Sequence, residues 1–178
     1  MDKQYRWLLS EISLPPLIER SLPLIGVQEK YGPGSNQTII EWANTVGAKA
    51  LGVPYTDDST AWCGLYVAYV ARAAGFTLPK IAIRAKSWIN FGAAAVRPGF
   101  GDVLVFDRAG GGHVAIYVGE DATAYHVLGG NQKDAVSITR IDRKRMVAAR
   151  RPLYEKTGKS WGRVISLAPD GVLSHNEA

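Results

Sequence analysis

The single cysteine of this chain and one of its three histidines could together perform nucleophilic catalysis. Cys63 lies between a tryptophan and a glycine, near the predicted start of a helix, in the segment DDSTAWCGLYVAYVARAAG. The thiolate is the nucleophilic form of cysteine, and a helix N-terminus favours it because the backbone N–H groups there are unpaired. We therefore expect Cys63 to be an anion near neutral pH. The alternative interpretation is a buried cysteine that acts only as a small apolar residue.

The candidate general base is His113, which follows three glycines and opens the segment HVAIYVGE. Imidazole accepts and returns protons near neutral pH, and a glycine run lets the chain approach another group closely. A cysteine and a downstream histidine on different elements of a small domain form the arrangement that activated-thiol enzymes use. Trp62 and Gly112, which precede the two residues, are expected to line the substrate cleft.

A third polar side chain should orient the imidazole by accepting its second N–H. Asn131 follows two glycines in LGGNQKD, and His126 lies in AYHVL, on a strand expected to pair with that of His113. An asparagine after two glycines is also ordinary turn chemistry, and a strand histidine can be purely structural. The spacing alone does not decide between the two.

Three aspartates near these segments have structural interpretations. Asp57 and Asp58 are expected to interact with the N-terminus of the cysteine helix, where their charge would oppose thiolate formation. Asp102, before a buried strand, is expected to form a turn. No histidine and cysteine cluster has metal-ligand spacing, and no phosphate loop or dinucleotide fingerprint is present, so no metal and no cofactor are expected.

The elements that must position these residues follow from periodicity. Short helices broken by prolines are expected before the turn GPGSN, and apolar spacing predicts a helix after it, capped by Asn36 or Thr38. The cysteine helix is expected to be capped by Ser59 or Thr60 and to end at Gly75. A further short helix is expected over residues 85–94.

The second half of the chain has the character of an antiparallel sheet. Four short runs rich in β-branched and aromatic residues alternate with turn residues, namely GDVLVFDR, HVAIYVGE, TAYHVLGG and AVSITRID, and MVAARRPL is a fifth candidate strand. This spacing predicts an antiparallel meander curled into a half-barrel. Helices followed by strands indicate an α+β fold.

Composition is that of one globular domain, with 178 residues, 47% hydrophobic and 21% charged. We assign residues 1–155 to a single domain, with the helical segment 1–35 packed on it, and residues 156–178 to a basic, partly disordered tail. No apolar run is long enough to cross a membrane, and the N-terminus lacks the continuous apolar core of a cleavable signal peptide.

The net charge of +5 is concentrated near the C-terminus. This basic stretch favours a solvated surface or contact with an anionic polymer, and it lacks the aromatic residues typical of a nucleic-acid site. Its nine basic residues are Arg140, Arg143, Lys144, Arg145, Arg150, Arg151, Lys156, Lys159 and Arg163.

Taken together, residues 5–152 resemble the papain-like cell-wall hydrolases of the CHAP and NlpC-type superfamily, in particular a compact branch associated with phages and prophages. The likeness rests on AWCGLYVAYVARAAG, GFGDVLVFDR, GGHVAIYVGED and YHVLGGNQKDAVSI. The resemblance implies a papain-like fold in which Cys63 attacks an amide carbon of peptidoglycan and His113 is the base. The CHAP pattern assigns the third role to Asn131, which we prefer, and the NlpC-like pattern assigns it nearer His126.

The resemblance also implies a biological setting. The bond would be the N-acetylmuramoyl-L-alanine amide or an amide of the stem peptide or cross-bridge, cut by a monomeric endolysin-like protein or lytic effector. Such a protein is made in the cytoplasm and acts at the cell wall or periplasm after release or export, with a holin-type export partner or an immunity protein as its partner. A non-catalytic relative that binds the cell wall or a protein partner is the alternative. Papain-like enzymes often carry an amide side chain for the oxyanion where Asp57 and Asp58 stand, so backbone N–H groups would have to serve here.

Overall fold

The structure is a computed structural model that describes residues 1–155, 158–175 and 177. Its first half is helical, and its helices are η1 (Lys3–Leu9), α1 (Pro16–Ser21), η2 (Leu22–Leu24), α2 (Gln37–Val46), α3 (Ala48–Leu51), α4 (Cys63–Ala73) and η3 (Ala85–Asn90), where η marks a 3₁₀ helix. The helix predicted over 85–94 is therefore shorter, because the chain turns extended after residue 90 and forms strand β1 (Ala93–Ala94).

Two of the predicted helix ends are confirmed and one is wrong. The side chain of Asn36 accepts the N–H of Thr38 at 2.9 Å and caps α2, and Gly75, with φ of +84°, follows the end of α4. Neither Ser59 nor Thr60 caps α4, because the helix begins only at Cys63, its N-cap position is Trp62, and it has no side-chain cap. Ser59 instead lies in a local turn, in which its N–H donates to the Asp57 side chain at 2.9 Å.

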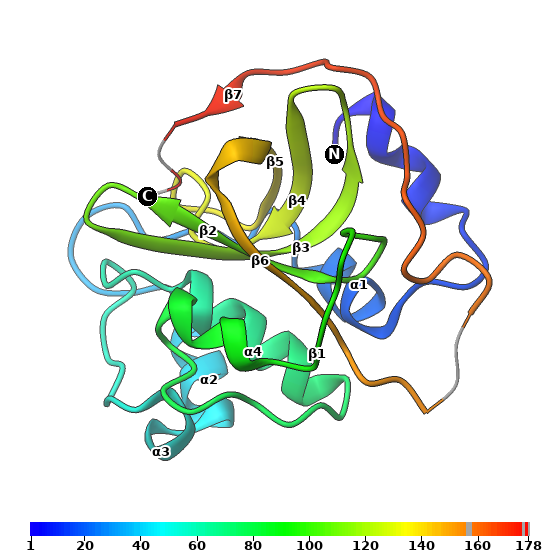
Figure 1. Ribbon diagram of the computed structural model, residues 1–178. Helices are drawn as coiled ribbons and strands as arrows, with labels where there is room; N and C mark the ends of the chain where they lie inside the picture. Colours follow the sequence, from blue (N-terminus) through cyan, green and yellow to red (C-terminus); the bar gives the residue numbers. More distant parts are fainter. Residues whose placement is uncertain (156–157, 176, 178) are drawn as a thin grey trace.

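The remaining strands are β2 (Val103–Arg108), β3 (Gly111–Glu120), β4 (Ala124–Gly129), β5 (Ser137–Asp142), β6 (Met146–Arg151) and β7 (Leu173–Ser174). They form a seven-stranded sheet in the order β1-β6-β2-β3-β4-β5-β7, in which only β5 and β7 run parallel. The predicted meander is confirmed as β2 to β5, and MVAARRPL supplies β6. The sheet is curved and open (Figure 1).

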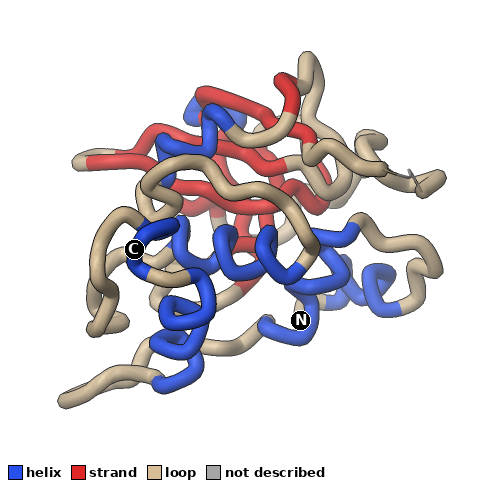
Figure 2. Tube along the Cα trace, turned by 90° about the horizontal axis from the view of Figure 1, so that it is seen from below, coloured by secondary structure: helices blue, strands red, loops and turns tan. Residues whose placement is uncertain are grey.

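The helices cover one face of the sheet, as Figure 2 shows, and α4 packs directly on β3. Large side chains buried between these layers include Trp62, Tyr66 and Trp88. On the opposite face the curl of the sheet encloses a second apolar cluster around Phe106 and Tyr117. The expected α+β fold with N-terminal helices against a C-terminal antiparallel sheet is thus confirmed.

The described part of the tail follows the sheet instead of leaving it. Phe100 and Arg163 are joined by a backbone hydrogen bond of 2.8 Å, Leu167 donates to the Glu120 carbonyl at 2.9 Å, and β7 pairs with β5. The partly disordered tail expected over residues 156–178 stays a prediction. Its remaining positions, residues 156–157, 176 and 178, lie outside the described residues.

The basic stretch is not the free charged surface that the sequence predicted. Four of its arginines pair with carboxylates whose side chains are nearly or fully buried, in the pairs Arg140–Asp121, Arg143–Glu120, Arg145–Glu177 and Arg151–Asp102. Asp102 also accepts the Gly99 N–H at 2.8 Å, in keeping with its predicted turn role. Burying these carboxylates requires paired cations, so the arginines serve folding. None of the described helices is long and apolar enough to cross a bilayer.

Candidate active site

The structure brings Cys63 and the strand of His113 together. Cys63 is the first residue of α4 and is 5% exposed. The backbone N–H groups of Val114 and Gly64 lower the pKa of its thiol, and Val114 is the strand neighbour of His113. The two residues predicted to react therefore lie on elements that pack against each other, the start of α4 and β3.

Gly64 has no side chain, and this allows the first turn of α4 to lie against the segment before η3. A Cβ atom on Gly64 would lie 2.1 Å from the Ile83 carbonyl oxygen and 2.7 Å from that of Ala82. The first turn of α4 thus rests directly on the backbone that precedes η3. Only glycine permits this approach without movement of one of the two segments.

His113 is fully buried and is held at one ring nitrogen. Its Nε2 lies 3.1 Å from Oε1 of Gln132, and the Gln132 Nε2 donates to the Ser137 carbonyl at 2.6 Å. The carbonyl can only accept, so the amide nitrogen of Gln132 must face Ser137 and its oxygen must face the imidazole. That oxygen also only accepts, so the Nε2 of His113 carries the proton and Nδ1 carries the lone pair.

The other ring nitrogen is the open position of the site. Within the described residues, Nδ1 of His113 is buried without a hydrogen-bond partner. Nearly all buried polar atoms in proteins are paired, so an unpaired one demands an explanation. A general base needs a free lone pair, and Nδ1 of His113 has one. His113 directly precedes Val114, whose N–H lowers the pKa of the Cys63 thiol.

Gln132, rather than Asn131 or His126, contacts the imidazole. Asn131, Lys133 and Asp134 all have φ near +55° to +61°, and this turn directs the side chain of Gln132 toward His113. Asn131 is buried, and its Oδ1 has no partner within the described part of the chain. The sequence does show a second amide side chain, Gln132, directly after Asn131. It does not show the path of the turn, which decides which of the two amides reaches the imidazole.

His126 belongs to a separate network. Its Nδ1 lies 2.7 Å from the hydroxyl of Tyr5 and its Nε2 lies 2.9 Å from Oδ2 of Asp121. Arg140 binds the same carboxylate oxygen at 2.8 Å. With both ring nitrogens engaged by other groups, His126 cannot orient His113 in this arrangement.

The electrostatics of the site differ from the sequence prediction. Burial raises the pKa of the Cys63 thiol, against the opposing effects of the Val114 N–H and the charge of Arg108. Burial also lowers the pKa of His113 to about 4. The expected thiolate is therefore wrong here, since both the Cys63 thiol and the His113 imidazole are neutral at neutral pH. Desolvation outweighs the helix terminus, and burial was not visible in the sequence.

Trp62 is part of the core. It is fully buried, and its Nε1 donates to Oε1 of Glu29 at 2.7 Å. Gly112 is half-buried and pairs with Asp107 of β2, and a Cβ atom there would lie 3.1 Å from the Phe106 carbonyl oxygen. The substrate contacts predicted for Trp62 and Gly112 both stay predictions.

The two aspartates before α4 do not cap it. Asp58 is buried and accepts the N–H groups of Lys30 and Asn36 at 2.9 and 2.7 Å, so it ties the segment before α2 to the segment before α4. Asp57 is exposed and holds Ser59. Their predicted interaction with the start of α4 is wrong, and that helix has no side-chain cap.

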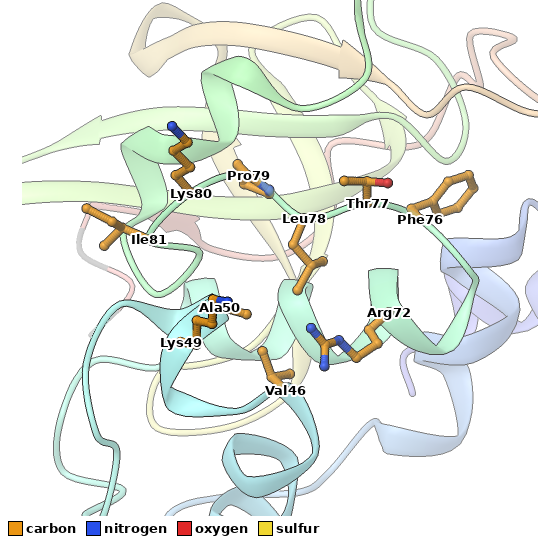
Figure 3. A pocket seen from close by; sticks show the side chains of 10 residues that line it. All are labelled: Val46, Lys49, Ala50, Arg72, Phe76, Thr77, Leu78, Pro79, Lys80 and Ile81. Atoms are coloured by element: carbon orange, nitrogen blue, oxygen red, sulfur yellow. The ribbon is translucent and has the colours of Figure 1, made fainter.

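A hollow lies outside this site. It has a volume of about 680 Å³ and is lined by the ends of α2 and α4, by α3 and by the loop before η3 (Figure 3). Its lining residues are Val46, Lys49, Ala50, Arg72, Phe76, Thr77, Leu78, Pro79, Lys80 and Ile81. Cys63 and His113 are not among them. The described residues contain no group of three or more histidine, cysteine or acidic side chains that could hold a metal ion.

No protein-family model matches this chain, and no curated protein matches it either.

Proposed function

We propose that the protein is a cysteine amidohydrolase with Cys63 as nucleophile, His113 as general base and acid, and Gln132 as the residue that orients the imidazole. The observation that carries this proposal is the unpaired Nδ1 of His113, the residue next to Val114, whose N–H lowers the pKa of the Cys63 thiol. The amide of Gln132 fixes the tautomer that leaves this nitrogen able to accept a proton.

The reaction is an acyl transfer in two halves. Nδ1 of His113 takes the thiol proton as the sulfur of Cys63 bonds to the amide carbon, and the carbonyl oxygen becomes an oxyanion. The oxyanion is stabilised by backbone N–H groups at the uncapped start of α4. His113 then gives the proton to the leaving nitrogen as the C–N bond breaks. A water molecule, deprotonated by the same nitrogen, releases the acid and restores the thiol.

Peptidoglycan is the proposed substrate because of the resemblance of the Cys63 and His113 segments to cell-wall hydrolases. A papain-like fold belongs to the same proposal, supported by a cysteine at a helix start and a histidine on the antiparallel sheet. The proposed setting, as an endolysin-like or lytic protein at the cell wall, has the same basis.

Mass analysis of purified peptidoglycan after incubation tests the proposal. We expect wild-type protein to release fragments with a new amine and a new carboxyl group, and the masses identify the amide that is cut. Cys63→Ser is the matched control, since it changes one atom and should keep the thermal unfolding midpoint. Equal release by wild-type and Cys63→Ser protein would overturn the mechanism.

The complete burial of both reactive residues favours a second candidate, a non-catalytic protein that binds cell wall or a partner. It predicts that wild-type protein sediments with peptidoglycan, releases no fragments, and binds unchanged after Cys63→Ser. The same incubation therefore distinguishes the two functions.

A further inference from the structure

A carboxylate from the C-terminal tail lies in a two-point arginine clamp next to the candidate active site. Nη1 and Nη2 of Arg145 donate to the two carboxylate oxygens of Glu177 at 2.8 and 2.7 Å. The hydroxyl of Ser174 donates to the same carboxylate at 3.0 Å. Paired parallel hydrogen bonds of this kind are the geometry by which arginine recognises a carboxylate.

The same guanidinium also binds the hairpin formed by β2 and β3. Nε of Arg145 donates to the carbonyl of Asp107 at 2.9 Å, so all three of its nitrogens are engaged. Asp107 follows Phe106, the residue directly opposite His113 in the β2–β3 pair. The guanidinium is thereby fixed in position relative to the strand that carries the imidazole.

Glu177 is close to the reacting groups. Its charge raises the pKa of His113, and the imidazole in turn lowers that of the Glu177 carboxyl. Its carbonyl accepts the N–H of Lys133 at 2.9 Å, directly after the Gln132 that holds the imidazole.

The segment before Glu177 is held through its backbone. Strand β7 pairs with β5 at two positions, and Arg140 and Arg145 donate to the carbonyls of Gly171 and Ser174 at 2.7 and 3.2 Å. Asp170 and Val172 are exposed, whereas the Glu177 side chain is fully buried. The two-point contact with Arg145 is the attachment made by the Glu177 side chain itself.

We propose that Arg145 forms a carboxylate-binding subsite for the substrate and that Glu177 occupies this subsite in cis, closing the active site until substrate displaces the tail. This proposal rests on the proposed amidohydrolase function. The substrate class is an amide with a free carboxylate near the scissile bond. A carboxylate of the substrate would replace the one on Glu177, so the buried arginine would never be left without a partner.

Alkylation of Cys63 tests the subsite, because this is the only cysteine in the chain and mass analysis counts its modification without ambiguity. Iodoacetate carries a carboxylate and iodoacetamide does not, while both react by displacement of iodide by sulfur. In Glu177→Ala protein we expect both reagents to react faster than in wild type. We also expect the iodoacetate-to-iodoacetamide rate ratio to rise about tenfold, the size of one charge-assisted contact.

Three variants control this measurement. Asp170→Ala removes an exposed carboxylate from the same tail and should leave the ratio unchanged. Arg145→Gln, added to Glu177→Ala, should return the ratio to the wild-type value, and Arg145→Lys should give an intermediate ratio because the charge stays and the two-point clamp is lost. A ratio in Glu177→Ala equal to that of wild type would overturn the proposal.

A competition measurement needs no arginine variant, so it remains decisive if Arg145→Gln fails to fold. In Glu177→Ala protein, N-acetylglutamate should slow iodoacetamide labelling more than N-acetylglutamine at equal concentration. Equal protection by the two would overturn the subsite.

The labelling is independent of hydrolysis, so the two proposals can fail separately. A raised ratio without peptidoglycan fragments would retain the subsite and reject the hydrolase, whereas fragments with an unchanged ratio would do the opposite. If both hold, peptidoglycan with amidated stem-peptide carboxylates should be cleaved more slowly than the free-acid form.

Discussion

Two buried histidines on neighbouring strands show how differently this fold uses the same side chain. His126 on β4 has partners at both ring nitrogens, Tyr5 and Asp121, and the carboxylate is bound in turn by Arg140. His113 on β3 has Gln132 at one nitrogen and none of the described residues at the other. The first network is complete, and the second lacks one member.

The difference teaches where to look for chemistry in a buried site. A satisfied histidine contributes to stability, because removing it would leave its partners unpaired in the interior. A half-satisfied histidine reduces stability, and the fold retains it next to the only thiol of the chain. We therefore expect substitutions at His113 to affect turnover and substitutions around His126 to affect the free energy of unfolding.

The largest expected effect comes from removing each imidazole in turn. His113→Ala should lower peptidoglycan turnover by about a thousandfold or more, because the general base and the leaving-group acid are lost together. His126→Gln should keep the turnover per folded molecule and lower the unfolding midpoint. Comparable losses of turnover in the two variants would abolish the distinction.

The pH dependence of stability gives the second effect. Burial lowers the pKa of His113 to about 4 from an unfolded value near 6.5. Its contribution is fully present above pH 6.5 and is lost as the pH falls toward 4, since the unfolded chain takes up the proton first. Between pH 7 and pH 4.5, urea unfolding should therefore show roughly 2 kcal/mol more loss of stability in wild type than in His113→Gln. Parallel loss in both would refute this assignment.

Removal of the orienting amide should have a smaller effect on turnover. Gln132→Ala frees the imidazole to rotate, and we expect turnover to fall by about a hundredfold, the lower end of the range for a positioned proton-transfer group. Asn131→Gly is the matched control, because glycine keeps the positive φ of this turn. A greater loss in Asn131→Gly would return the third role to Asn131.

The smallest effect is expected at the outer edge of the His126 network. Tyr5→Phe removes the hydroxyl bound to Nδ1 of His126 and should cost about 1–2 kcal/mol of unfolding free energy. Turnover should stay unchanged, as measured by fragment release at a temperature where both proteins are folded. A tenfold fall in turnover in Tyr5→Phe would instead show that the hydrogen bonds of His126 also affect catalysis at His113.

Local signals in the sequence were sufficient for much of the fold. Apolar spacing predicted the body of α4, strand runs predicted the β2–β5 meander, and Asn36 was correctly assigned as a cap. Residue chemistry also selected Cys63 and His113, which the structure brings to adjoining elements. These features depend on side-chain periodicity and on residues close in sequence.

Features that depend on distant contacts were not predictable in this way. The direction of Gln132 is set by a turn with successive positive φ angles, and the role of Arg145 is set by a tail residue 32 positions away. The inward pairing of the basic stretch likewise requires knowledge of which carboxylates lie beneath it. Sequence patterns report composition and period, but they do not report the path of an irregular segment.

Gly64 has a consequence for how this protein can change over time. An added methyl group would collide with two carbonyl oxygens on the facing segment, so α4 or that segment would have to move. The residue that moves first is the neighbouring Cys63, while most of the helix remains anchored by its apolar side chains. Gly64→Ala is thus a route by which a descendant could keep its architecture and lose its reactivity in one step.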